Sequence, residues 1–156
     1  MERRQGDFLV SDDPTLVDLD VVHGYLARSY WSANIPRDML ARAIEHSLCF
    51  GVYDEADGRQ VGFARVVTDR ATYAYLADVF VLEEYRGRGL SKLLMSTIMD
   101  HPDLQTLRRW TLATRDAHGL YAQFGFTPLA QPERYMEKRN PAIHRDGRYV
   151  QPEDSE

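Results

Sequence analysis

Hydrophobic residues along the first half of the chain recur at two spacings, one typical of strands and one typical of helices. The apolar run at residues 7–11 predicts a short first strand. From Asp18, apolar residues at Leu19, Val22 and Leu26 recur at helical spacing and predict a helix that reaches about Ser29. Pro36 fits the first turn of a second helix, whose inner face would carry residues 40, 43, 44 and 47 or 48.

The middle of the chain predicts an antiparallel sheet followed by a helix. Two β-rich runs within residues 48–69 flank a polar segment that contains Asp57 and Gly58, which is typical of a hairpin. A third run, residues 71–82, is expected to pair with this hairpin. A helical stripe of apolar residues then begins at Leu90 and ends near His101 and Pro102.

The last third of the chain predicts three further strands and one helix. The strands are expected at residues 109–114, 126–130 and 134–138. The helix lies between the first two of them, with Thr114 or Asp116 as its cap, Tyr121 on its inward face and Gly125 at its end. We therefore expect a single domain at residues 1–139 and a polar tail, surface-bound or mobile, at 140–156.

Composition narrows the class of protein and of ligand. The chain has 156 residues, of which 44% are hydrophobic and 28% charged, as in an ordinary soluble domain. Its net charge of -5 argues against general nucleic-acid binding and mildly favours a cationic or amine substrate. No segment has the length or apolar content of a signal peptide or membrane span, so we expect a cytoplasmic protein without a membrane partner. The single cysteine, Cys49, is interpreted as a buried strand residue and, as the alternative, as a nucleophile.

The chemistry centres on residues 78–91, where a predicted strand leads into the start of a helix through the sequence RGRGLS. Gly87 and Gly89 permit a tight turn with outward N–H groups, and the helix dipole adds partial positive charge. Such a turn can bind phosphate, and Arg86, Arg88 and Lys92 would add fixed charge. A turn with solvated arginines and no ligand is the alternative interpretation. The spacing excludes both the P-loop and the dinucleotide fingerprint.

The order of elements and two motifs resemble the GNAT superfamily of acyl-CoA-dependent N-acetyltransferases. The first motif, [RQ]-x-x-G-x-[GA], aligns with Arg86, Gly87, Arg88, Gly89, Leu90 and Ser91, and Ser91 replaces the family's glycine or alanine. The second, Y-x-x-x-G-F, is met by Tyr121, Gly125 and Phe126. The resemblance covers the chain to about Lys138. It implies an α/β (α+β) fold with a mixed, mostly antiparallel sheet of about seven strands and helices on both faces.

The same resemblance implies where acetyl-CoA, the co-substrate, would bind. Its pyrophosphate would contact the amides of residues 86–91, and its pantetheine arm would lie along Val79, Phe80 and Val81. The N–H of Val79 or Val81 could hold the thioester carbonyl. The family often has an asparagine seven residues before the tyrosine of the second motif. That position is Thr114 here, which we expect at the cofactor contact.

Two residues are candidates for proton transfer. Tyr121 matches the family's general acid, which protonates the departing sulfur; the alternative is a core aromatic. Asp78 is a carboxylate within an apolar strand and could act as a base through water. It could equally be a structural residue, paired with Arg65 or Arg115.

The acceptor would contact the loop between the first two helices. Tyr30 and Trp31 lie in that loop, and the alternative for Trp31 is packing at the helix junction. The sequence thus predicts an acetyltransferase that moves acetyl to a primary amine of a small molecule by direct attack in a ternary complex, without a metal. A protein or peptide amine as acceptor and a non-catalytic acyl-CoA sensor are the alternatives, and a homodimer is possible through edge strands.

Overall fold

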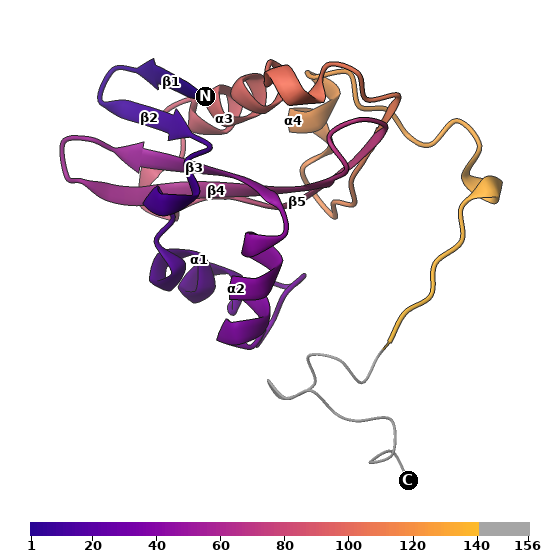
Figure 1. Ribbon diagram of the computed structural model, residues 1–156, viewed down its shortest axis with the longest axis horizontal. Coiled ribbons are helices and arrows are strands. Elements are labelled where there is room, and N and C mark those ends of the chain that lie inside the picture. Colours follow the sequence, from indigo (N-terminus) through magenta and orange to yellow (C-terminus); the bar gives the residue numbers. More distant parts are fainter. Residues whose placement is uncertain (141–156) are drawn as a thin grey trace, which may run out of the picture.

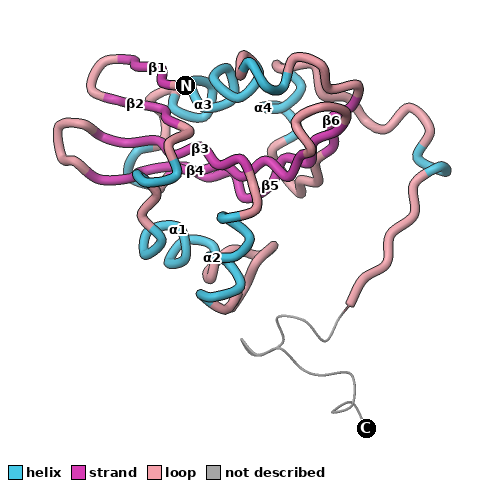
Figure 2. The backbone as a smooth tube through the Cα atoms, viewed as in Figure 1, coloured by secondary structure: helices cyan, strands magenta, loops and turns pink. Residues whose placement is uncertain are grey.

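The computed structural model describes residues 1–140, which form one six-stranded sheet with helices on both faces (Figures 1 and 2). Strands follow the order β1-β2-β3-β4-β5-β6; all neighbours are antiparallel except β5 and β6, which are parallel. The strands are β1 Glu2–Gln5, β2 Phe8–Ser11, β3 Leu48–Asp54, β4 Arg59–Thr68, β5 Tyr73–Val81 and β6 Arg109–Thr111. The α-helices are α1 Leu19–Leu26, α2 Arg37–Glu45, α3 Leu90–Met99 and α4 His118–Ala122.

Two apolar clusters hold the helices to the sheet. On one face, Leu26 of α1 and Leu40 of α2 are buried together with Cys49, Phe63 and Phe80 from the strands. On the other face α3 buries an apolar stripe that begins at Leu90, and α4 adds Tyr121 (Figure 1). The predicted α/β class, the mostly antiparallel sheet and the helices on both faces are confirmed.

Local sequence accounts for several element boundaries. The Asp18 carboxylate accepts hydrogen bonds from the amides of Asp20 and Val21 and so caps α1. Pro36 immediately precedes α2, where its missing N–H costs no hydrogen bond within the helix. The predicted hairpin of β3 and β4, and its antiparallel pairing with β5, are both confirmed.

The predicted strand count and the two C-terminal strands are wrong. Residues 126–130 and 134–138 form no strand; this stretch contains a single 3₁₀ turn, Pro132–Arg134, and Pro128 and Pro132 have no N–H to offer to a ladder. Conversely, the polar segment Glu2–Gln5 forms β1, because Gly6, at φ 58, turns the chain back onto β2. The predicted tail, residues 140–156, lies outside the described residues except for Asn140.

No helix in the described part of the chain has the length and apolar content needed to cross a membrane.

Candidate active site

The turn before α3 has the backbone geometry that an anion site requires. Gly87 and Gly89 both have left-handed conformations, with φ of 78 and 77. A Cβ at Gly87 would meet nothing within 4 Å, so the turn faces open space. Within the described residues, no protein group accepts a hydrogen bond from the amides of residues 87–91. These donors, at the positive end of a helix dipole, suit phosphate oxygens.

The two arginines of the turn are held by the protein. Arg86 donates to the Val81 carbonyl at 3.1 Å and to the Tyr25 hydroxyl at 3.0 Å. The Arg88 guanidinium lies over the Tyr85 ring, 5.0 Å from its centroid. Both side chains remain exposed, so each is positioned and still accessible to a ligand.

Beside this turn, the sheet opens between β5 and β6. The two strands pair only where Tyr73, Ala74 and Tyr75 of β5 face β6. Further along β5, Asp78 and Val79 lie opposite the single residue Ala64 of β4, because Phe63 pairs with Phe80 and Arg65 with Ala77. Asp78, at φ 56, occupies this bulge. The bulge and the loss of pairing leave the second half of β5 facing a cleft.

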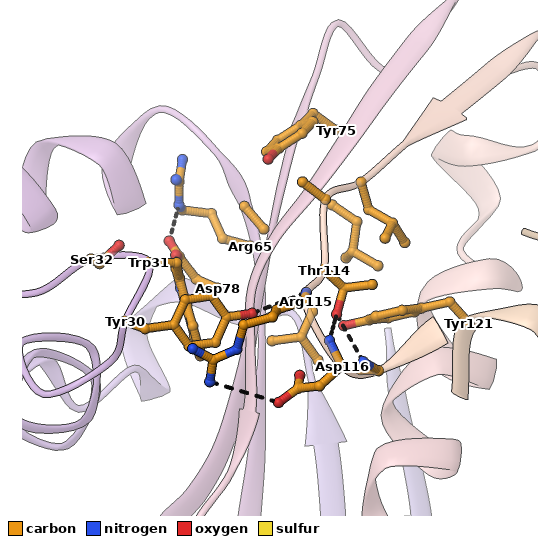
Figure 3. Close-up of a pocket in the computed structure, with 16 residues that line it drawn as sticks. Tyr30, Trp31, Ser32, Arg65, Tyr75, Asp78, Thr114, Arg115, Asp116 and Tyr121 are labelled. Atoms are coloured by element: carbon orange, nitrogen blue, oxygen red, sulfur yellow. Dashed lines mark hydrogen bonds and ion pairs between the residues drawn. The ribbon is translucent and has the colours of Figure 1, made fainter. Parts of the chain in front are cut away.

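Two clefts occupy this opening and share one wall. The larger has a volume of about 750 Å³ and the smaller about 510 Å³. The larger reaches toward the turn before α3 and is lined by Phe80, Arg86 and Ser91. The smaller is lined by Arg65, Tyr75 and Thr114 (Figure 3). Residues common to both clefts are Tyr30, Trp31, Val79, Arg115, Asp116, Ala117 and Tyr121.

Tyr121 stands where the two clefts meet. Tyr121 lies on α4, and its ring packs against Phe126, which follows the helix, with ring centroids 6.0 Å apart. In Figure 3 the Tyr121 side chain extends into the cleft. Burial, with Tyr30 and Asp116 nearby, raises the pKa of Tyr121 to about 12. Its hydroxyl therefore carries a proton throughout the neutral range and can donate it.

Tyr30 and Arg115 come from opposite walls of the opening and contact each other where the two clefts meet. The Arg115 amide donates to the Tyr30 hydroxyl at 3.2 Å, and the Arg115 guanidinium stacks 3.8 Å from the Tyr30 ring centroid. These contacts join the loop after α1 to the loop before α4 (Figure 3). Because they span the opening between β5 and β6, they define the boundary between the two clefts.

Asp78 is buried, and both of its carboxylate oxygens have partners. One accepts from Arg65 Nε at 2.7 Å and the other from the indole of Trp31 at 3.0 Å. Of the two arginines considered from sequence, Arg65 makes the pair, while Arg115 lies near Asp116. Arg65 also donates to the Ser47 hydroxyl.

The remaining residues singled out from sequence are distributed over both clefts and the core. Val81 and Leu90 are buried in the core beside the turn. Thr114 lines the smaller cleft, not the one that reaches the turn, and its hydroxyl accepts from the Ala117 amide at 3.0 Å. The N-cap of α4 is Ala117, which has no side-chain cap, so the prediction of Thr114 or Asp116 as the cap is wrong. Cys49 is a buried strand residue, as predicted. Among the described residues, no three His, Cys, Asp or Glu side chains are grouped to hold a metal ion.

Tyr25 was not recognised from sequence. It stacks on Phe80, with ring centroids 4.0 Å apart, and its hydroxyl accepts from Arg86. It also lines the larger cleft. Its aromatic ring on a predicted helix gave no local signal, because its partners lie far along the chain.

Comparisons with known proteins agree with this geometry. A family model described as an acetyltransferase (GNAT) domain matches residues 45–128, which include the turn and Tyr121. A presumed acetyltransferase from Gibberella zeae is 33% identical over 141 residues, covering 76% of this chain and 78% of that protein. The crystal structure of a presumed GNAT acetyltransferase from Xanthomonas campestris pv. campestris is 54% identical, with a TM-score of 0.84 over 88% of this chain and 96% of that one. Glucosamine-6-phosphate N-acetyltransferase from Arabidopsis thaliana, 15% identical, shares the fold, with a TM-score of 0.61 over 85% of this chain and 97% of that one.

Proposed function

The chain belongs to the GNAT family of acetyltransferases, and on that premise we propose that it transfers acetyl from acetyl-CoA to a primary amine of a small molecule, by direct attack in a ternary complex. The observation that carries the proposal is the meeting of two clefts at Tyr121 and Val79. One cleft suits an acyl donor and the other an amine, so both substrates can be bound together. A ternary complex requires such an arrangement.

We assign the larger cleft to the donor. The amides of residues 87–91, which have no acceptor among residues 1–140, and the left-handed glycines offer a cradle for the pyrophosphate. Arg86, and Arg88 beside it, would add charge at that cradle. Val79, Phe80 and Val81 would run beside the pantetheine arm, and acetyl-CoA would supply an activated thioester. The Val79 amide would donate a hydrogen bond to the thioester carbonyl as negative charge develops on it.

Tyr121 acts as the general acid in this proposal. Because its pKa is raised to about 12 by burial, the hydroxyl keeps its proton until the thiolate departs. General acid catalysis of this kind contributes about 10²–10⁴-fold to a rate. The phenol lines both clefts, so it can reach the departing sulfur while the amine is bound.

The smaller cleft would hold the amine. Tyr30 and Trp31 provide aromatic walls, which can also hold a cation over a ring face. An alkyl ammonium, with a pKa of about 10, must lose a proton before it attacks. Asp78 is our candidate for accepting that proton through water. Since Arg65 and Trp31 already occupy its oxygens, a purely structural role is the competing assignment.

Replacement of Tyr121 by Phe tests the proposal. We expect kcat to fall by about 100-fold while acetyl-CoA binds with unchanged affinity, measured by thiol release over a panel of amines and by calorimetry. Tyr53→Phe is the matched control, because the Tyr53 hydroxyl is buried, has no hydrogen-bond partner within the described part of the chain, and lines neither cleft. A Tyr121→Phe variant with full turnover would contradict the acid role. Acetyl-CoA binding without turnover on any small amine would favour a protein acceptor or a sensor.

A further inference from the structure

The smaller cleft is walled by aromatic rings that solvent reaches. Three of the ten large hydrophobic side chains that are exposed among the described residues line it. They are Tyr30, Trp31 and Tyr75, with exposed fractions of 50%, 41% and 37%. Rings that face an open cleft are typical of a site for an apolar ligand, because apolar and aromatic side chains dominate the lining of small-molecule pockets.

The three rings lie at two places along the cleft. Tyr30 and Trp31 also line the larger cleft, so they stand near the junction that holds Tyr121. Tyr75 lines only the smaller cleft and so lies away from the junction. At about 3.3 Å per residue of strand, Tyr75 lies at most roughly 13 Å along β5 from Val79. Figure 3 shows Tyr75 set apart from Tyr30 and Tyr121.

Four further residues of the lining are apolar. Leu76 and Ala77 follow Tyr75 on β5, and Leu112 and Ala113 follow β6. Their side chains neither donate nor accept hydrogen bonds. The hydrocarbon part of a ligand is stabilised by burial against such walls, whereas a polar body would lose its water there without replacement.

The charged residues of the smaller cleft occur as two pairs of opposite sign. Among the described residues that line it, the charged side chains are Arg65, Asp78, Arg115 and Asp116. Arg65 Nε lies 2.7 Å from the Asp78 carboxylate, and Arg115 Nη2 lies 3.9 Å from that of Asp116. Their formal charges sum to zero. A polyamine would therefore meet no excess of carboxylates here, and a phosphorylated amine would meet no excess of cations.

A neutral, apolar cleft also suits the chemistry at the nitrogen. An ammonium group is disfavoured where apolar surface displaces water, so binding there lowers the pKa of the amine. More of the bound amine then has the lone pair that attacks the thioester. The lining that selects an apolar amine thus also promotes the loss of its proton.

We propose that the acceptor is an arylalkylamine, in which a short hydrocarbon chain joins the primary amine to an aromatic ring. The amine lies at the junction beside Tyr121, and the ring lies against Tyr75. Edge-to-face and offset-stacked contacts favour an aromatic ring over a saturated one of the same size. The reaction of the amine rests on the proposed acetyl transfer, whereas the binding of the ring does not.

In the transfer, the neutral amine nitrogen attacks the thioester carbon, and a C–N bond replaces the C–S bond. The departing sulfur takes the phenol proton of Tyr121. The nitrogen releases one proton, which returns to the Tyr121 oxygen through water. The products are an N-acetyl arylalkylamine and free coenzyme A.

Calorimetry with the full chain tests the ring without requiring turnover. The probes are phenethylamine, cyclohexylethylamine, ethylamine and the polyamine spermidine. We expect phenethylamine to bind at least about 10-fold more tightly than ethylamine, because its ring buries apolar surface. It should also bind about 3-fold more tightly than cyclohexylethylamine. Equal affinity for phenethylamine and ethylamine, equal affinity for the two rings, or tightest binding of spermidine would each overturn the proposal.

Variants of Tyr75 locate the ring. Tyr75→Ala should remove most of the advantage of phenethylamine over ethylamine, and Tyr75→Leu only its advantage over cyclohexylethylamine. Tyr73→Ala is the matched control, because Tyr73 lies two residues away on β5 and is 41% exposed but lines neither cleft. Unfolding curves check that the variants fold. An undiminished preference in Tyr75→Ala, or an equal loss in the control, would overturn the proposal.

Thiol release over the same amines separates this inference from the acetyltransferase proposal. We expect kcat/KM for phenethylamine to exceed that for ethylamine by at least about 10-fold. Faster turnover of spermidine or of an amino sugar phosphate would overturn the arylalkylamine and leave acetyl transfer standing. Binding of phenethylamine that depends on Tyr75, without acetylation of any amine, would instead overturn acetyl transfer and leave the aromatic site standing.

Discussion

The indole N–H of Trp31 donates a hydrogen bond of 3.0 Å to the carboxylate of Asp78, which joins the loop after α1 to the bulge in β5. The two residues are 47 positions apart in the sequence. Asp78 stands in the strained, left-handed region of the backbone, and its side chain is only 6% exposed. The bond therefore ties a wall of the acceptor cleft to the strand that would carry the acyl donor.

Replacing Trp31 by Phe should weaken the fold as well as the cleft. The change keeps most of the aromatic surface but leaves a buried carboxylate oxygen without its donor, which costs about 1–3 kcal/mol. Chemical denaturation measures this loss in the free energy of unfolding. Tyr30→Phe is the control, because it removes a hydroxyl that accepts, among the described residues, from the exposed Arg115 amide alone. An equal loss in both variants would contradict the special role of the indole.

Asp78→Asn should destabilise the protein by about 3–5 kcal/mol, because it leaves the Arg65 guanidinium without its buried counter-ion. Asparagine tolerates the left-handed backbone about as well as aspartate, so the loss reports the charge. Denaturant titration of the single variant and of the double variant with Arg65→Met gives the coupling energy. A change below 1 kcal/mol, roughly the worth of a surface pair, would show that the pair is solvated.

Kinetics of the same Asp78→Asn variant separate the two roles of the carboxylate. A structural residue should alter the KM of the acceptor and leave the pH dependence of kcat unchanged. A general base should lower kcat by about 100-fold or more and remove the acidic limb of the pH profile. Rescue of kcat at high pH, where the amine is already neutral, would favour the base.

Gly89→Ala and Gly24→Ala should change stability in opposite directions. Gly89 has φ 77, so a side chain there costs about 1–2 kcal/mol in backbone energy. Gly24 lies within α1, where a Cβ would meet nothing within 4 Å, and alanine should add about 0.5–1 kcal/mol. Thermal or denaturant unfolding measures both, and calorimetry should find weaker acetyl-CoA binding for Gly89→Ala only. Equal affinities would contradict the role of the turn in donor binding.

The core of the fold was predictable because its signals are local. The apolar stripe that starts at Leu90 predicts α3, and the polar turn at Asp57 and Gly58 predicts the hairpin of β3 and β4. The C-terminal strands were not, because the apolar residues around Leu129 and Tyr135 have the composition of strands, but Pro128 and Pro132 interrupt the stretch and have no N–H to offer to a ladder. The sequence pattern does not predict β1, because this exposed edge strand is polar throughout and shows no apolar alternation.

The site was predictable only where a motif is continuous in sequence. The glycine turn and Tyr121 lie within such motifs. Contacts that join distant segments left no trace in the pattern. The Tyr25 hydroxyl bonds to Arg86 across 61 residues, and the Tyr30 hydroxyl bonds to Arg115 across 85. The sequence allows Asp78 to pair with Arg65 or with Arg115. The register of β4 against β5 places Arg65 beside Asp78 and so decides between them.

The buried thiol of Cys49 makes stability fall at alkaline pH. Burial raises its pKa from 9.0 to about 12. The unfolded thiol therefore releases its proton as pH rises above 9.0, whereas the folded thiol keeps it until about 12. A raised pKa contributes full stability below the unfolded value, and that stability is lost between the two values. Within this window the loss approaches about 1.4 kcal/mol per pH unit. Tyr121, whose pKa is also raised to about 12, adds to it above its ordinary value of 10.0.

Cys49→Ala isolates the share of the thiol in this pH dependence. The variant loses the packing of the side chain at every pH. Its unfolded state has no thiol at position 49 to ionise, so this source of alkaline destabilisation is absent. The gap in unfolding free energy between native and variant protein should therefore narrow by roughly 1 kcal/mol from about pH 8 to about pH 10. Urea titrations at the two pH values measure the gap. The native thiol should also resist alkylation until the chain unfolds, because only 6% of the residue is exposed. A constant gap, or rapid alkylation of the folded chain, would mean that Cys49 ionises freely in the fold and would reopen its assignment as a nucleophile.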